Sequence, residues 1–177
     1  MRKTLALFLS LLMMAMILCS CGASRSNITI EELEAALSES NSGLAFNTEK
    51  TSSGYNFSKK ITNFEYSGTA DSDKYVKSIT IVCEHDAVNQ LKNGTEVERI
   101  LTKFYKNAKS CTYKEYLVAC YIVETLILCD ALGEGNAVNT TDVISIFSSG
   151  KVLHINGWTV KATVAQNKCT ITSTYGE

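Results

Sequence analysis

The sequence contains no proline and no excess charge of either sign, and these absences exclude several classes of protein. With no Pro and 10 Gly in 177 residues, it is neither a collagen-like repeat nor a proline-rich stalk. Its 17 basic and 18 acidic residues give a net charge of −1, which argues against binding of nucleic acid or electrostatic docking on anionic lipid. No two of its 7 cysteines have the CxxC spacing of zinc or thioredoxin-like sites. What is present is a chain of single-domain length, 45% apolar, that can bury a core.

The first residues have the pattern of an export signal. Arg2 and Lys3 form a positive start, and an uncharged, mainly apolar run follows over residues 5–18. A helix that spans a bilayer needs about twenty apolar residues, so this run is too short to be one. It is typical of the apolar region of a signal peptide.

The run ends in the sequence LCSCG, residues 18–22, which resembles the lipobox of bacterial lipoproteins. In this register Cys21 is the lipidated residue, with small Ser20 at −1 and Leu18 at −3; lipidation of Cys19 would put bulky Leu18 at −1. The resemblance implies that residues 1–20 are removed and that Cys21 carries a thioether-linked diacylglycerol, with acyl chains such as palmitate. Two or more chains hold a protein stably on a membrane. An ordinary secretory signal, which would leave a free cysteine at the cleavage site, is the alternative.

These signals divide the chain into three parts. We expect a lipoprotein signal peptide (1–20), a lipid-anchored tether (21–27) and a single globular domain (28–177). The six residues after Cys21, 22–27, span at most about 20 Å when extended. The folded domain is therefore expected close to the cell membrane, on its extracytoplasmic face.

Three Thr-x-x-Glu sequences match the capping box that begins many helices, at Thr29, Thr95 and Thr112. They predict helices over about 30–38, 96–108 and 113–131, and a fourth, short helix is expected over 141–148. The helix over 113–131 is apolar on every side, which is typical of a helix buried all round. Glu124 lies within it, and burial would raise its pKa strongly unless the side chain reaches a polar edge.

The remaining segments have the alternation and turn residues of strands. They cover 44–48, 54–58, 61–67 and 75–83 before the longer helices, and 151–155, 158–165 and 169–175 after them. The fold class expected is α+β: an antiparallel sheet with helices packed on one face, a central buried helix and a C-terminal three-stranded meander. A helix followed by strands occurs twice, an order similar to that of cystatin-like and β-lactamase-inhibitor-like modules, although no residues repeat.

The meander can be placed in register. Asn156-Gly157 predicts a type I′ hairpin that pairs Ile155 with Trp158. A two-residue loop at 167–168 would then set Val164 opposite Ile171 and keep the faces distinct. One face is expected to be core (Trp158, Val160, Ala162, Val164, Cys169, Ile171, Tyr175) and the other threonine-rich (Thr159, Thr163, Thr170, Thr172, Thr174).

Few residues suggest chemistry. Five cysteines remain outside the signal and the lipid site, an odd number that cannot all pair internally: Cys83, Cys111, Cys120, Cys129 and Cys169. We expect small buried side chains, and Cys83 with Cys169 is the pair to test for a disulfide. The sequence Glu84-His85-Asp86 follows a strand, where it could form a metal or acid–base site or simply a charged turn.

The function expected is that of a non-enzymatic, membrane-anchored binding or interaction module. No catalytic, cofactor or metal motif is nominated, so no cofactor and no metal are expected, and Cys21 is the one assigned site. The membrane, through this lipid, and a protein or peptide at the cell surface are the expected partners; the threonine-rich face and a free sheet edge at 169–175 are candidate contact surfaces. Alternatives are a small cell-surface hydrolase or metal-dependent enzyme around Glu84, His85 and Asp86, and a structural subunit of an envelope assembly.

Overall fold

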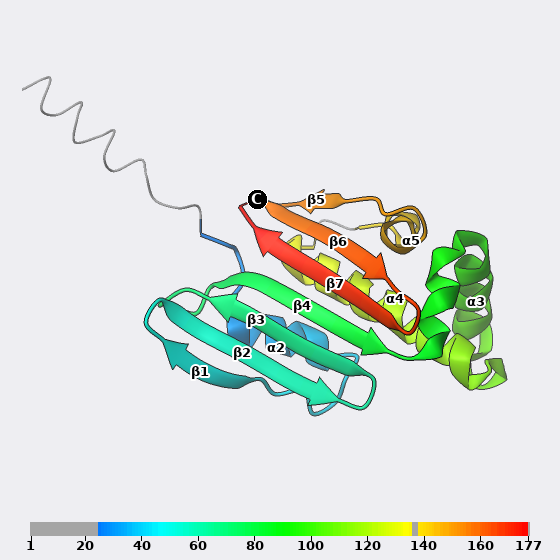
Figure 1. The fold of residues 1–177 in the computed structure, drawn as a ribbon, viewed down its shortest axis with the longest axis horizontal. Helices are drawn as coiled ribbons and strands as arrows, with labels where there is room; N and C mark the ends of the chain where they lie inside the picture. Colours follow the sequence, from blue (N-terminus) through cyan, green and yellow to red (C-terminus); the bar gives the residue numbers. More distant parts are fainter. Residues whose placement is uncertain (1–24, 136–137, 177) are drawn as a thin grey trace, which may run out of the picture.

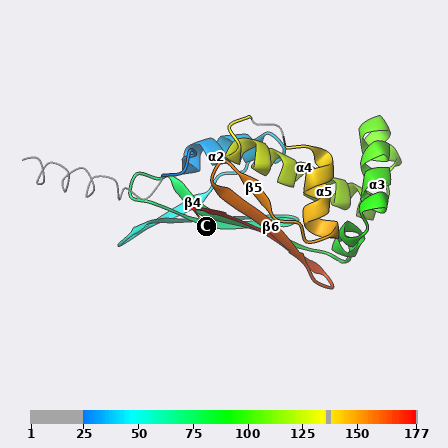
Figure 2. The same ribbon diagram turned by 90° about the horizontal axis from the view of Figure 1, so that it is seen from above.

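The computed structural model describes residues 25–135 and 138–176, so the signal and Cys21 lie outside the described residues. The described chain forms one seven-stranded antiparallel sheet with helices on one face (Figures 1 and 2), which confirms the α+β class. Its strands are β1 (Asn47–Thr51), β2 (Gly54–Ile61), β3 (Phe64–Ala70), β4 (Val76–Glu84), β5 (Leu153–Ile155), β6 (Trp158–Val164) and β7 (Lys168–Tyr175). Its helices are α2 (Ile30–Ser38), η1 (Asp86–Lys92), α3 (Gly94–Asn107), η2 (Ala108–Ser110), α4 (Tyr113–Leu132) and α5 (Thr140–Ser148).

The sheet order is β1-β2-β3-β4-β7-β6-β5, so each half of the sheet is a meander and the two halves join where β4 pairs with β7. The strand expected at 169–175 as a free edge is β7, which pairs with β4 and β6 on its two sides; that expectation is wrong. The edges are β1 and β5. Long-range pairing of β4 with β7 covers the edge that the C-terminal meander would otherwise expose.

Two of the three predicted capping boxes are confirmed. Thr29 accepts the N–H of Glu32 and Thr112 that of Glu115, and each glutamate reaches back to the backbone N–H of its cap. The box expected at Thr95 is absent because α3 begins earlier: Asn93 is its cap, and the Asn93 side chain accepts the N–H of Glu96. The 3₁₀ helix η1 before it was not predicted.

The C-terminal meander has the predicted faces, but one of its registers differs. Asn156 and Gly157 have φ of 46° and 82°, as a type I′ turn requires, and Ile155 pairs with Trp158. In the next hairpin the Ala165 N–H donates to the carbonyl of Lys168, so the two-residue loop is 166–167. Val164 therefore lies opposite Cys169 and not Ile171, a shift of two residues that leaves every side chain on its predicted face.

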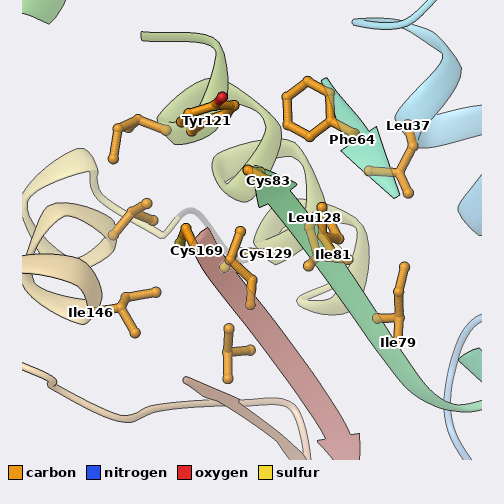
Figure 3. Close-up of a cluster of buried hydrophobic side chains, with 14 of the residues drawn as sticks. Leu37, Phe64, Ile79, Ile81, Cys83, Tyr121, Leu128, Cys129, Ile146 and Cys169 are labelled. Carbon is orange, nitrogen blue, oxygen red and sulfur yellow. The ribbon is translucent and has the colours of Figure 1, made fainter. Parts of the chain in front are cut away.

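The core lies between the sheet and the helices, with α4 at its centre. Side chains on the inner face of the sheet are buried: Phe57, Tyr66, Ile79, Ile81, Cys83, Trp158, Val160, Cys169 and Ile171. Helix α4 contacts α2, α3, α5 and η1 and buries residues on all its sides, as its apolar sequence predicted. Figure 3 shows the part of this cluster where Tyr121, Leu128 and Cys129 of α4 meet strands β4 and β7. None of the helices in the described ranges is long and apolar enough to cross a membrane.

Candidate functional site

The first place to examine is the end of β4, where the sequence suggested a metal or acid–base site. Glu84, His85 and Asp86 line an open hollow of about 700 Å³ together with the loop between β6 and β7. His85 caps η1: its Nδ1 accepts the Ala87 N–H at 3.1 Å. The same Nδ1 lies 2.9 Å from Asp86 Oδ1, so the atom is engaged by neighbours within its own turn.

The two carboxylates beside His85 are paired with lysines. Asp86 contacts Lys114, which holds the pKa of Asp86 below its ordinary value, and Glu84 lies 3.4 Å from Lys168. Over residues 25–135 and 138–176, no three His, Cys, Asp or Glu side chains gather in a way that could hold a metal ion. The arrangement is that of a helix cap with exposed ion pairs, so it adds no support to the enzyme hypothesis.

A second hollow, of about 600 Å³, lies between the helices and one end of the sheet. Its walls come from the α2–β1 loop, the β2–β3 turn, α3 and α4. The lining residues are Ser40, Asn41, Ser42, Ile61, Thr62, Asn63, Phe64, Phe104, Tyr116, Cys120, Val123 and Glu124. The volume falls within the range of small-ligand sites. We call this hollow the Glu124 pocket.

Helix α4 supplies the polar floor of this pocket. Tyr116, Cys120 and Glu124 are spaced four residues apart, so they lie on one face of the helix. Glu124 is 1% exposed, whereas Tyr116 is 44% exposed. The face therefore runs from a tyrosine at the surface to a carboxyl group in the interior.

Three side chains from distant segments hold the Glu124 carboxyl group. The Ser40 hydroxyl and the Asn41 amide each donate to Oε2 at 2.6 Å, and the Tyr66 hydroxyl donates to Oε1 at 2.6 Å. Tyr66 comes from the middle of β3 and is fully buried. This network fastens the α2–β1 loop to the sheet and to α4.

Burial has the largest effect on the pKa of Glu124. It raises the pKa of Glu124 above its ordinary value, against the three hydrogen bonds, which lower it. Burial and the neighbouring carboxylate also raise the pKa of Tyr66. The sequence expectation that Glu124 has a raised pKa is thus supported, and the acid lies in the interior and not on a polar edge.

The cysteines do not form a reactive centre. The five in the described residues are free thiols, and Cys83 lies directly opposite Cys169 across β4 and β7, near Cys129 (Figure 3). Burial raises the pKa of Cys129 and of Cys169 to about 12. Such thiols are protonated and weakly nucleophilic near neutral pH. Cys83, Cys129 and Cys169 are buried as expected, whereas Cys111 and Cys120 are only partly buried.

Sequence reasoning identified one member of the pocket and missed the rest. Glu124 was conspicuous as an acid inside an apolar helix. Its partners Ser40, Asn41 and Tyr66 carry no motif, because they come from a loop and a strand that only the tertiary fold brings together. His154, on the outer face of the sheet, is exposed and lies 3.3 Å from the Thr159 hydroxyl.

Comparisons with known proteins identify no relative of this chain. Protein-family models, curated protein sequences and solved structures were compared with the chain, and none of them matches it.

Proposed function

We propose that this protein is a non-enzymatic binding module of the cell envelope, anchored on the extracytoplasmic face by lipid on Cys21, that takes part of its partner into the Glu124 pocket. The observation that carries the binding role is the buried carboxyl group at the floor of a hollow about 600 Å³ in volume. A concave site with an apolar wall and a few convergent polar groups is the usual form of a ligand site. The lipobox-like sequence over 18–22 supports the anchor.

The path of the chain is consistent with this role. Arg25, four residues after Cys21, stacks on Tyr75 and pairs with Asp71 at 3.2 Å, just beyond the end of β3. Asn27 accepts the indole N–H of Trp158 at 3.0 Å. The chain thus joins the folded body at this end of β3.

The pocket lies at the other end of the same strand, where β3 begins at Phe64. Seven residues of strand separate the two ends by about 20 Å. In Figure 1 the chain reaches the body on the side opposite α3. A bilayer that holds Cys21 would leave the pocket facing outward, open to a partner.

Site-specific photo-cross-linking tests this proposal. The photoreactive amino acid p-benzoylphenylalanine would replace Thr62, an exposed pocket residue in the β2–β3 turn, in the full-length protein on intact cells. Ser53, exposed in the β1–β2 turn at the opposite end of β2, is the matched control. We expect an adduct of increased mass from position 62 and none from position 53. Equal adducts from both positions, or none from position 62, would overturn the proposal.

A further inference from the structure

The Glu124 pocket has an acidic floor and no basic residue in its walls. Among the described residues that line it, Glu124 is the one acidic side chain of the Asp or Glu type, and no Lys, Arg or His is present. The three groups that contact its carboxyl oxygens, from Ser40, Asn41 and Tyr66, are all neutral donors. Burial is costly for the charged form of a carboxyl group unless a cation compensates it, and the described lining of the pocket supplies no cation.

The hydrogen bonds that the structure gives this carboxyl group leave acceptor capacity for one more donor. A carboxylate offers about four acceptor positions, two on each oxygen. The Ser40 and Asn41 donors occupy Oε2, and Oε1 receives the Tyr66 hydroxyl. A ligand that donates to the remaining position on Oε1 would complete the shell.

Part of the pocket wall is aromatic and apolar, and it includes Phe64, Phe104 and Tyr116. Phe64 is nearly buried, and the rings of Phe104 and Tyr116 lie 5.7 Å apart, inclined at 55°, nearer the mouth. Ring faces attract a cation and also contact an aliphatic or aromatic stem. An anionic ligand would meet both the carboxylate and the negative ring faces.

We propose that the Glu124 pocket binds a primary ammonium group on an apolar stem, with the ammonium donating to Glu124 and the stem lying against Phe64, Phe104 and Tyr116. This inference rests on the proposed binding function and names the chemistry of its ligand. The ammonium supplies both the missing donor and the missing positive charge. A free small amine and a lysine side chain share this chemistry, and both have stems that fit the volume.

Titration of the folded wild-type protein with charge-matched probes tests the assignment. Benzylammonium, benzyl alcohol and benzoate share one ring and differ in charge, and amide chemical shifts in NMR report both affinity and location. We expect benzylammonium to bind about tenfold more tightly than the alcohol, because a charge-assisted hydrogen bond replaces a neutral one. Benzoate should bind most weakly. The shifts should map to Asn63 and Cys120 and leave Ser53 unchanged.

Two variants separate charge from shape. Glu124→Gln keeps the size of the side chain, and it should bring the affinity for benzylammonium down to that for benzyl alcohol. Tyr116→Leu changes a side chain that is 44% exposed, outside the buried network, so this variant should fold even if the first does not. Tyr116→Leu should weaken the binding of benzylammonium about threefold more than it weakens the binding of benzyl alcohol.

A further arm distinguishes the two sources of the ligand. Tighter binding of N-acetyl-lysine methylamide than of benzylammonium would identify a lysine of a protein partner, and the reverse order would identify a free amine. Equal affinities for benzylammonium and benzyl alcohol in the wild type would overturn the ammonium assignment. That result would leave the proposed binding function in place, since the cross-link from position 62 tests it independently.

Discussion

At the scale of single residues, Glu115 illustrates how one carboxylate can hold three partners and join two helices. Its Oε2 accepts the Thr112 N–H at 2.8 Å and lies 2.7 Å from Lys103 Nζ, and its Oε1 lies 3.0 Å from the guanidinium of Arg99. It thereby caps α4 and fastens this helix to α3. The hydrogen bond from Lys103, the Thr112 N–H and Arg99 lower the pKa of Glu115 to about 2.

We predict that Glu115→Gln lowers the free energy of unfolding at pH 7 by about 1 kcal/mol. The folded pKa is lower than the unfolded one, so the charge stabilises the fold above the unfolded pKa. This contribution is lost as pH falls through about 2. Urea unfolding at pH 7 and at lower pH checks the prediction: the difference from wild type should shrink below about pH 5. Glu98→Gln, exposed on α3, is the control, and an equal loss in both variants would contradict the mechanism.

Glu115 and Glu124 lie on the same helix and have opposite pKa shifts. Cations lower the pKa of the first, and burial raises that of the second. The sequence predicted the shift of Glu124, because an apolar helix surrounds it. It did not predict the shift of Glu115, whose cationic partners Arg99 and Lys103 belong to another helix. Local pattern reveals burial, whereas ion pairing between elements depends on the tertiary fold.

At the scale of elements, the β5–β6 hairpin depends on Gly157. This residue has φ of +82°, and a Cβ there would lie 2.9 Å from the ring of Tyr175, which itself packs on Trp158. Gly150 has a similar φ of +70° and open space around it. Both glycines therefore need the left-handed backbone conformation that glycine adopts most easily, but only a side chain at position 157 would also meet a neighbouring ring.

We predict that Gly157→Ala lowers the free energy of unfolding by about 2 kcal/mol and Gly150→Ala by about 1 kcal/mol. Both variants force a side chain into the left-handed region, and only the first also displaces Tyr175 from Trp158. Chemical denaturation monitored by tryptophan fluorescence measures both changes. Equal losses would show that the Tyr175 contact contributes nothing.

Elements were predicted from sequence far better than their boundaries. The Asn156-Gly157 turn and the capping boxes at Thr29 and Thr112 act through neighbouring residues, and all three are confirmed. The β6–β7 loop was misplaced by one residue, because alternation fixes the face of each strand and not its register. The start of α3 was misplaced because Asn93 and Thr95 are both good caps and the earlier one is used.

At the scale of the whole molecule, the pairing of β4 with β7 makes one sheet from two meanders. Strand patterns predicted the α+β class and the helices on one face, since most of the strands have one apolar side; β1, whose sequence is NTEKT, does not. They could not predict which strands meet, because the partners are about ninety residues apart and share no local signal. The Glu124 pocket was equally hidden, since a loop, a turn and two helices form it together.

The position of the molecule in the cell depends on Cys21, which lies outside the described residues. In the proposed anchoring, Cys21→Ser removes the sulfur that carries the acyl chains, so the protein should leave the membrane fraction or accumulate with its signal still attached. Cys19→Ser is the matched control: it changes a cysteine two residues away, within the segment expected to be removed, and should leave membrane association and the mature mass unchanged. Cell fractionation with intact-mass spectrometry distinguishes these outcomes. A mature N-terminus other than Cys21, or a bare thiol on it in the wild type, would contradict lipid anchoring. The body would then be free of the bilayer, and the orientation inferred for the pocket would lose its basis, because two acyl chains are what make the attachment stable.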